Sequence, residues 1–94
     1  MGYSQPMRVE MTEVYRDWIS GLRDLGARAR IQVRIDRLAY GNPGHFRALG
    51  RSLYELKIDV GPGYRVYYTV RRDVLIILLA GGDKSSQSRD IRTA

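Results

Sequence analysis

Apolar and polar positions alternate over three short stretches of the chain, and each of these stretches predicts a β-strand. They cover residues 8–12, 53–59 and 64–70. A fourth stretch, residues 74–80, is apolar at every position, which is typical of a strand that is covered on both faces. The Gly-Pro-Gly sequence at 61–63 favours a type II turn, so the second and third stretches are expected to form a β-hairpin.

Between the first two strands the apolar residues recur at the spacing of a helix. The first helical stripe follows Thr12, a suitable N-cap, and is expected to end at Gly26, which can adopt a positive φ. Its members are Val14, Trp18, Leu22 and Leu25. The second stripe continues to about Tyr40 and consists of Ala27, Ile31, Ile35 and Leu38. The glycines and the proline of residues 41–44 end this helix.

The two helices follow one another with a link of only one or two residues. Such a short link predicts a helical hairpin. Helices on one face of a mostly antiparallel sheet define an α+β fold, here with the element order β-α-α-β-β-β. The 94 residues, of which 44% are apolar, are expected to form a single domain, 1–94, and this size excludes a multidomain enzyme.

The composition excludes several kinds of chemistry. The chain has no cysteine and one histidine, so disulfides, thiolate nucleophiles and Cys-type zinc sites are excluded, and neither a metal nor a cofactor is expected. No apolar run approaches the roughly 20 residues that cross a bilayer. The first seven residues lack the features of a signal peptide, so a cytoplasmic location without membrane contact is expected.

Positive charge is concentrated in the middle of the chain. The net charge is +6, and residues 25–54 hold six arginines against one acid, Asp36. Such a surplus attracts phosphate polymers or acidic proteins, although it is also compatible with a solvated surface. Arg30, Arg34 and Arg37 form a row on the second helix and are a candidate docking surface for an acidic partner or a nucleic acid backbone.

One face of the predicted sheet is polar. If the helices cover the apolar positions of the hairpin, the opposite face carries Glu55, Lys57, Asp59, Arg65, Tyr67 and Thr69. Polar faces of this kind are often simply solvated. Here two cations on neighbouring strands are close enough to bind one phosphate group.

Three segments of the chain, residues 27–44, 53–68 and 75–91, resemble a known family. The sequence GPGYRVYY followed by GGDKSSQ is similar to the HigB-like, phage-derived branch of the RelE/ParE toxin superfamily. The resemblance covers roughly residues 8–92. It implies a bacterial type II toxin with a RelE-like fold. It also implies a metal-independent mRNA endonuclease that acts on the ribosome and is inhibited by a helix-turn-helix antitoxin.

The resemblance also implies roles for individual residues. The catalytic candidates are Lys57, Arg65 and Lys84. From the residues themselves, and not from the resemblance, the candidate RNA contacts are Arg47, Arg51, Tyr67 and Arg89, and the antitoxin candidates are the row Arg30, Arg34 and Arg37. A tyrosine in a strand is also compatible with ordinary packing. Two positions depart from the pattern. Glu55 stands where RelE carries a second lysine, and the tail has no aromatic residue where RelE has a tyrosine.

RNA cleavage requires a proton acceptor, a cationic clamp and a proton donor. Arg65 suits the clamp because a guanidinium stays charged and binds phosphate oxygens in a fork. Lys57 and Lys84 could add charge or transfer protons, and Glu55 with His45 or Lys84 is an alternative acid–base pair. Two other functions stay open. One is inhibition of DNA gyrase, as in ParE-type relatives, and the other is antitoxin or RNA binding without toxicity.

Overall fold

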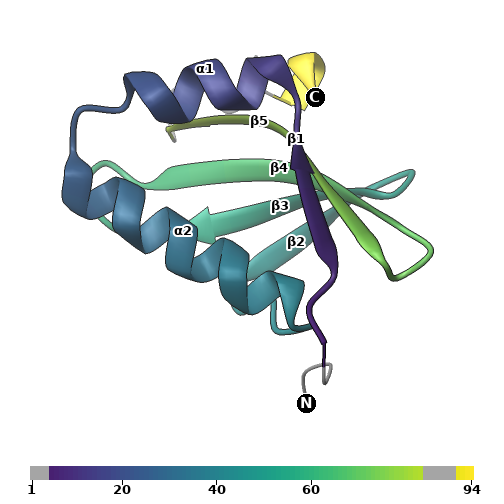
Figure 1. The fold of residues 1–94 in the computed structure, drawn as a ribbon. Coiled ribbons are helices and arrows are strands. Elements are labelled where there is room, and N and C mark those ends of the chain that lie inside the picture. Colours follow the sequence, from purple (N-terminus) through teal and green to yellow (C-terminus); the bar gives the residue numbers. More distant parts are fainter. Residues whose placement is uncertain (1–4, 84–90) are drawn as a thin grey trace.

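Five strands form one sheet, and two helices lie on one of its faces (Figure 1). The computed structural model describes residues 5–83 and 91–94. In chain order the elements are β1 (Arg8–Met11), α1 (Glu13–Gly21), α2 (Leu25–Ala39), β2 (Phe46–Gly50), β3 (Leu53–Ile58), β4 (Tyr64–Arg71) and β5 (Leu75–Asp83). The strand order is β1-β5-β4-β3-β2, with β1 parallel to β5 and every other pair antiparallel. This arrangement confirms the predicted α+β class.

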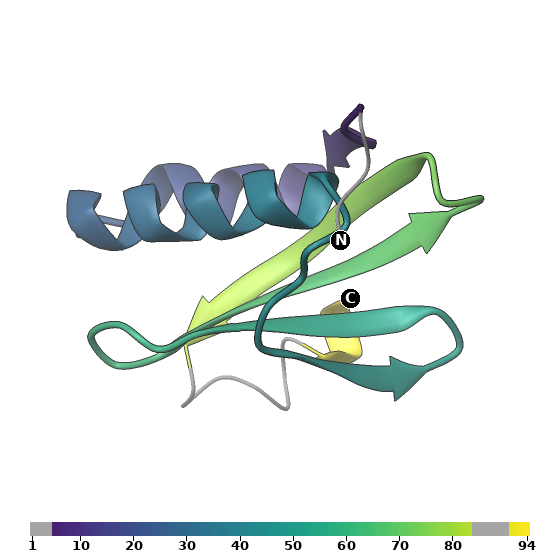
Figure 2. The same ribbon diagram turned by 90° about the horizontal axis from the view of Figure 1, so that it is seen from below.

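The core lies between the helices and the inner face of the sheet (Figure 2). All four apolar residues predicted for the second helical stripe are buried there. The alternating positions of the hairpin that were expected to meet the helices are buried as well: Leu56, Ile58, Val66 and Tyr68. Because these side chains leave water together, they fix both the face and the register of the sheet.

The first helix is shorter than the apolar spacing predicts. Thr12 is its N-cap, as expected, and the Thr12 hydroxyl oxygen accepts a hydrogen bond from the Tyr15 N–H at 3.1 Å. The helix ends at Gly21, and the prediction that Gly26 ends it is wrong. Asp24 begins α2 instead, since its carboxylate accepts from the Ala27 N–H at 3.0 Å. Leu25 is consequently 70% exposed and lies outside the core.

The strand β2 is absent from the sequence prediction, which treats this region as a loop. It pairs antiparallel with β3 at the edge of the sheet, and most of its residues are exposed. An exposed edge strand needs no alternation of apolar and polar residues, so the pattern does not reveal it. The β3–β4 hairpin is confirmed. A bond from the Gly63 N–H to the Val60 carbonyl, 3.0 Å, places its turn one residue earlier than predicted.

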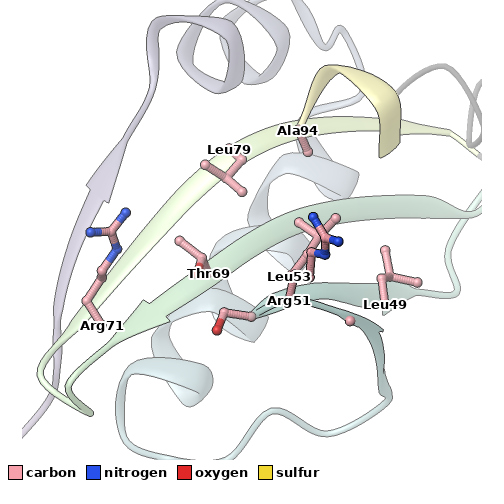
Figure 3. A pocket seen from close by; sticks show the side chains of 9 residues that line it. Leu49, Arg51, Leu53, Thr69, Arg71, Leu79 and Ala94 are labelled. Carbon is pink, nitrogen blue, oxygen red and sulfur yellow. The ribbon is translucent and has the colours of Figure 1, made fainter.

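The last strand passes through two glycines that were expected to end it. Gly81 and Gly82 both belong to β5, which continues to Asp83. A side chain at Gly81 would overlap the Trp18 ring of α1, so this glycine permits close packing of a helix on the sheet. After β5, residues 91–93 form a helical turn on the face of the sheet opposite to the helices (Figure 3).

Candidate functional site

Lys57 and Arg65 lie opposite one another on adjacent strands. The antiparallel register of β3 and β4 pairs them directly, between the pairs Glu55–Tyr67 and Ile58–Tyr64. Directly opposed residues of an antiparallel pair have their Cβ atoms about 5 Å apart and point to the same face. That face is the one opposite to the helices, as the sequence predicted. The structure therefore brings two of the candidate catalytic residues together, while their role stays a prediction.

Arg65 is far more buried than the sequence predicts. Its exposed fraction is only 7%. One terminal nitrogen, Nη1, donates to the carbonyl of Tyr64 at 3.0 Å, whereas the buried Nε has no hydrogen-bond partner among the described residues. No described carboxylate forms an ion pair with this guanidinium. Burying a cation with an unpaired N–H group lowers the stability of the fold, unless a ligand supplies the missing negative charge and hydrogen-bond acceptor.

The expectation of a solvated polar face is also wrong for Glu55 and Tyr67, both fully buried. The Oε1 atom of Glu55 lies 3.3 Å from Nη2 of Arg47, which covers it from the edge strand. Alternation identifies the face of each residue, but not whether another segment covers that face. Both side chains are shielded from solvent in this structure, and the roles of Glu55 as a base and of Tyr67 in stacking on an RNA base stay predictions. Arg47 retains half of its side-chain exposure, and its proposed RNA contact stays a prediction.

A histidine and an aspartate meet near the turn of the β3–β4 hairpin. Nδ1 of His45 is 3.4 Å from Oδ2 of Asp59, and both side chains are mostly exposed. The N–H of Lys57 donates to the His45 carbonyl at 3.0 Å, so His45 sits beside Lys57 across the strand edge. An imidazole next to a carboxylate is suited to proton transfer near neutral pH. The sequence singled out His45 but not this pairing, which depends on the unpredicted strand β2.

Arg34 has a different role from its neighbours in the arginine row. Its guanidinium donates to three backbone carbonyls, those of Lys57 at 2.6 Å, Pro43 at 3.0 Å and His45 at 3.0 Å. It thereby fixes α2 to β3 and to the loop before β2. Burial, and secondly the charge of Arg37, lower the pKa of Arg34, while Asp59 opposes the shift. Arg30 and Arg37 remain exposed, and the docking role of the row stays a prediction.

The arginine row lines a small pocket. Arg30, Arg34 and Arg37 surround a space of about 250 Å³ together with Val33, Ile58 and Asp59. We call it the α2 pocket. It lies between the helix and the end of β3, adjacent to the segment that carries Lys57. Three guanidinium groups in one small space favour an anion.

A larger pocket of about 690 Å³ opens on the opposite face of the sheet (Figure 3). Its apolar lining consists mainly of Leu49, Leu53 and Leu79, and the cations Arg51 and Arg71 add charge. Arg51, predicted to contact RNA, thus lines the same pocket as a second arginine, Arg71, that sequence reasoning missed. Arg71 ends β4, and the sequence treats it as part of a turn.

Some predictions fall outside what the structure describes. Lys84 and Arg89 lie in residues 84–90, beyond the described part of the chain. Among residues 5–83 and 91–94, no three His, Asp or Glu side chains cluster as a metal site would require. Within the same residues no helix is long and apolar enough to span a membrane.

The fold is that of RelE-type proteins. A chain of the toxin–antitoxin complex RelBE2 from Mycobacterium tuberculosis matches 90% of this chain with a TM-score of 0.57, at 17% sequence identity and over 99% of its own length. At this identity the likeness establishes the fold alone.

The chain belongs to the family of phage-derived Gp49-like proteins, whose model matches residues 17–94. It is also 44% identical over 88 residues to an uncharacterized protein of Haemophilus influenzae, which covers 94% of this chain and 89% of that protein. The family match and the fold confirm the resemblance inferred from the sequence.

Proposed function

We propose that this protein is the toxin of a bacterial type II toxin–antitoxin system and that it cleaves mRNA on the ribosome. The observation that carries the proposal is the buried Arg65, which pairs with Lys57 in the register of β3 and β4 and whose Nε donor has no hydrogen-bond partner among the described residues. A phosphate group supplies what such a cation lacks, namely negative charge and hydrogen-bond acceptors. The RelE-like fold and the phage-derived family support the same function.

In the proposed reaction the ribose 2′-hydroxyl loses its proton and attacks the neighbouring phosphorus. The bond to the 5′-oxygen then breaks, and this oxygen takes up a proton. Arg65 and Lys57 stabilise the negative charge that develops on the phosphate oxygens. His45, oriented by Asp59 at 3.4 Å, is the candidate for one of the proton transfers. Lys84 remains a candidate for the other.

The proposed partner is a small antitoxin of the helix-turn-helix type. The structural relative comes from a toxin–antitoxin complex, and this supports a protein inhibitor for the present chain. We expect the protein to co-purify with the product of a neighbouring gene. Isolation of the native protein as a free monomer would count against this part of the proposal.

Cleavage of mRNA in a reconstituted translation system tests the enzymatic part. We expect the wild type to cut ribosome-bound mRNA, and Arg65→Gln to lower the single-turnover rate by roughly 100-fold or more. Lys57→Gln should also be impaired. Arg23→Gln, an exposed arginine in the link between the helices, is the matched control and should cut normally.

Two results would contradict the proposed nuclease activity. One is intact mRNA in the presence of folded wild-type protein. The other is growth arrest with gyrase-dependent DNA breaks that persist in the double variant Lys57→Ala, Arg65→Ala. The second result would favour gyrase inhibition, which needs no cleavage residues.

A further inference from the structure

The α2 pocket carries more positive charge than its own residues neutralise. Three arginines line it together with a single acidic residue, Asp59. This carboxylate also lies 3.4 Å from His45, so it is shared with a second group. The mutual repulsion of Arg34 and Arg37 adds to the imbalance. An anion in this pocket would relieve the repulsion.

The three arginines are not equivalent within the pocket. Arg34 is held by its three carbonyl bonds, so its charge has a fixed position. Arg30 and Arg37 are exposed, and neither side chain forms a hydrogen bond or ion pair with any other described residue. Their guanidinium groups therefore remain available. One fixed cation flanked by two adaptable ones can surround a tetrahedral phosphate and match its oxygens with paired N–H donors.

The α2 pocket adjoins the proposed cleavage site. Arg34 donates to the carbonyl of Lys57 and to that of His45, so the same guanidinium lines the pocket and supports the strand that carries Lys57. Asp59 lines the pocket and pairs with His45. The pocket lies on the helix side of the end of β3, whereas Lys57 and Arg65 belong to the opposite face, so the two sites are joined around the end of the strand, where His45 meets Asp59. Proteins that bind single-stranded nucleic acid commonly follow its backbone with such a succession of cations.

We propose that the α2 pocket binds a phosphate of the same RNA strand whose backbone is cut between Lys57 and Arg65. This inference rests on the proposed function and adds a second contact with the substrate. The two sites lie on opposite faces of the sheet and near the same end of β3, which favours RNA over an acidic protein, because one continuous polyanion that passes around this end reaches both places. The pocket holds the strand in position and takes no part in the chemistry.

Two measurements test the inference. The first is equilibrium binding of a fully 2′-O-methylated single-stranded RNA, which cannot be cleaved, at several salt concentrations. For Arg30→Gln, Arg37→Gln we expect about 10-fold weaker binding and a log–log salt dependence reduced by about 0.7, the loss of one phosphate contact. The matched control is Arg16→Gln, Arg23→Gln, which removes the same charge from exposed positions outside the pocket. It should retain the wild-type salt dependence.

The second measurement is the cleavage rate against ribosome concentration. The pocket variant should show KM raised about 10-fold with kcat unchanged, and Arg30→Lys, Arg37→Lys should recover part of the loss. Equal RNA affinity for pocket variant and wild type would overturn the inference, as would an equal loss in the control. Unchanged RNA binding with lost binding of the antitoxin would assign the pocket to a protein instead.

Failure of the inference and failure of the proposed function are distinguishable. If the wild type cuts mRNA and the pocket variant has unchanged KM and RNA affinity, only the inference fails. If the wild type does not cut mRNA, the proposed nuclease function is wrong, and the binding experiment alone decides whether the pocket binds a phosphate. Thermal unfolding of each variant confirms that the exposed substitutions leave the fold intact.

Discussion

The ring of Trp18 occupies the space in which a side chain at Gly81 would lie. Trp18 belongs to α1 and Gly81 to β5, so this contact sets how closely the first helix approaches the sheet. The Trp18 ring also packs at a tilt against the rings of Tyr15 and Tyr64, with ring centroids 5.7 Å and 6.4 Å away, and therefore cannot move aside freely. The glycine is required for packing, and the strand does not end there as the sequence suggests.

Gly81→Ala should destabilise the protein by about 1–3 kcal/mol, since the added methyl group forces the helix away from the sheet. The measurement is urea denaturation followed by circular dichroism. Gly21→Ala is the control, because a Cβ at Gly21 meets nothing within 4 Å and alanine favours a helix. It should be neutral or stabilising. Equal unfolding free energies for Gly81→Ala and wild type would show that the contact does not limit the packing.

Arg34→Gln should destabilise the protein by about 2–3 kcal/mol, because it removes a charged group that serves three carbonyls. Arg37→Gln, three residues further along the same helix and exposed, should change stability by less than about 0.5 kcal/mol. Chemical denaturation of both variants gives the comparison. Similar values for the two would mean that the carbonyl bonds of Arg34 contribute no more than an exposed charge.

Much of the fold could be predicted because its buried residues follow simple periods. The stripe on α2 recurs at helical spacing, and the hairpin strands alternate, so both reveal the inner face of the sheet. The strand β2 leaves no such trace, since it lies at the edge and is mostly exposed. The continuation of β5 through Gly81 depends on Trp18, which is 63 positions away in the sequence, and no local pattern reports a contact of this kind.

The candidate site was predictable to a similar extent. Alternation predicted that Lys57 and Arg65 share one face of neighbouring strands, and the structure confirms this. Their direct pairing did not follow, because the register depends on the turn, which lies one residue earlier than predicted. Burial of the polar face did not follow, because it depends on which segments cover that face. Arg34 looks identical to Arg30 and Arg37 in the sequence. Only its three carbonyl partners distinguish a structural arginine from two available ones.

The stability of the protein should fall as the pH rises from about 10 to about 12. Burial raises the pKa of Tyr15 to about 12 and, with a smaller contribution from Tyr54, that of Tyr68 to about 12, against 10.0 for an ordinary tyrosine. The folded state thus holds these protons more tightly than the unfolded state. The stability that these two protonated tyrosines contribute to the folded state is fully present below pH 10 and is lost as the pH approaches 12.

Absorbance of tyrosinate against pH, compared with the loss of circular dichroism, tests this dependence. The chain has seven tyrosines, and we expect Tyr15 and Tyr68 to be among those that ionise only together with unfolding. In Tyr68→Phe the number of these late-ionising tyrosines should fall by one. Ionisation of all seven near pH 10 in the folded protein would contradict the burial of both phenols.

Arg65→Met should separate stability from activity. Arg65 is 7% exposed, and its Nε has no hydrogen-bond partner among the described residues, so the folded protein carries the cost of a buried and incompletely satisfied cation. A methionine of similar length removes this cost and loses only the bond to the Tyr64 carbonyl. We expect the unfolding free energy to stay equal or rise by about 1 kcal/mol, while cleavage of ribosome-bound mRNA is abolished. Tyr64→Phe, which keeps that carbonyl, is the structural control. A loss of several kcal/mol in Arg65→Met would show that Arg65 is needed for the fold, and the case for a cation held ready for phosphate would then be lost.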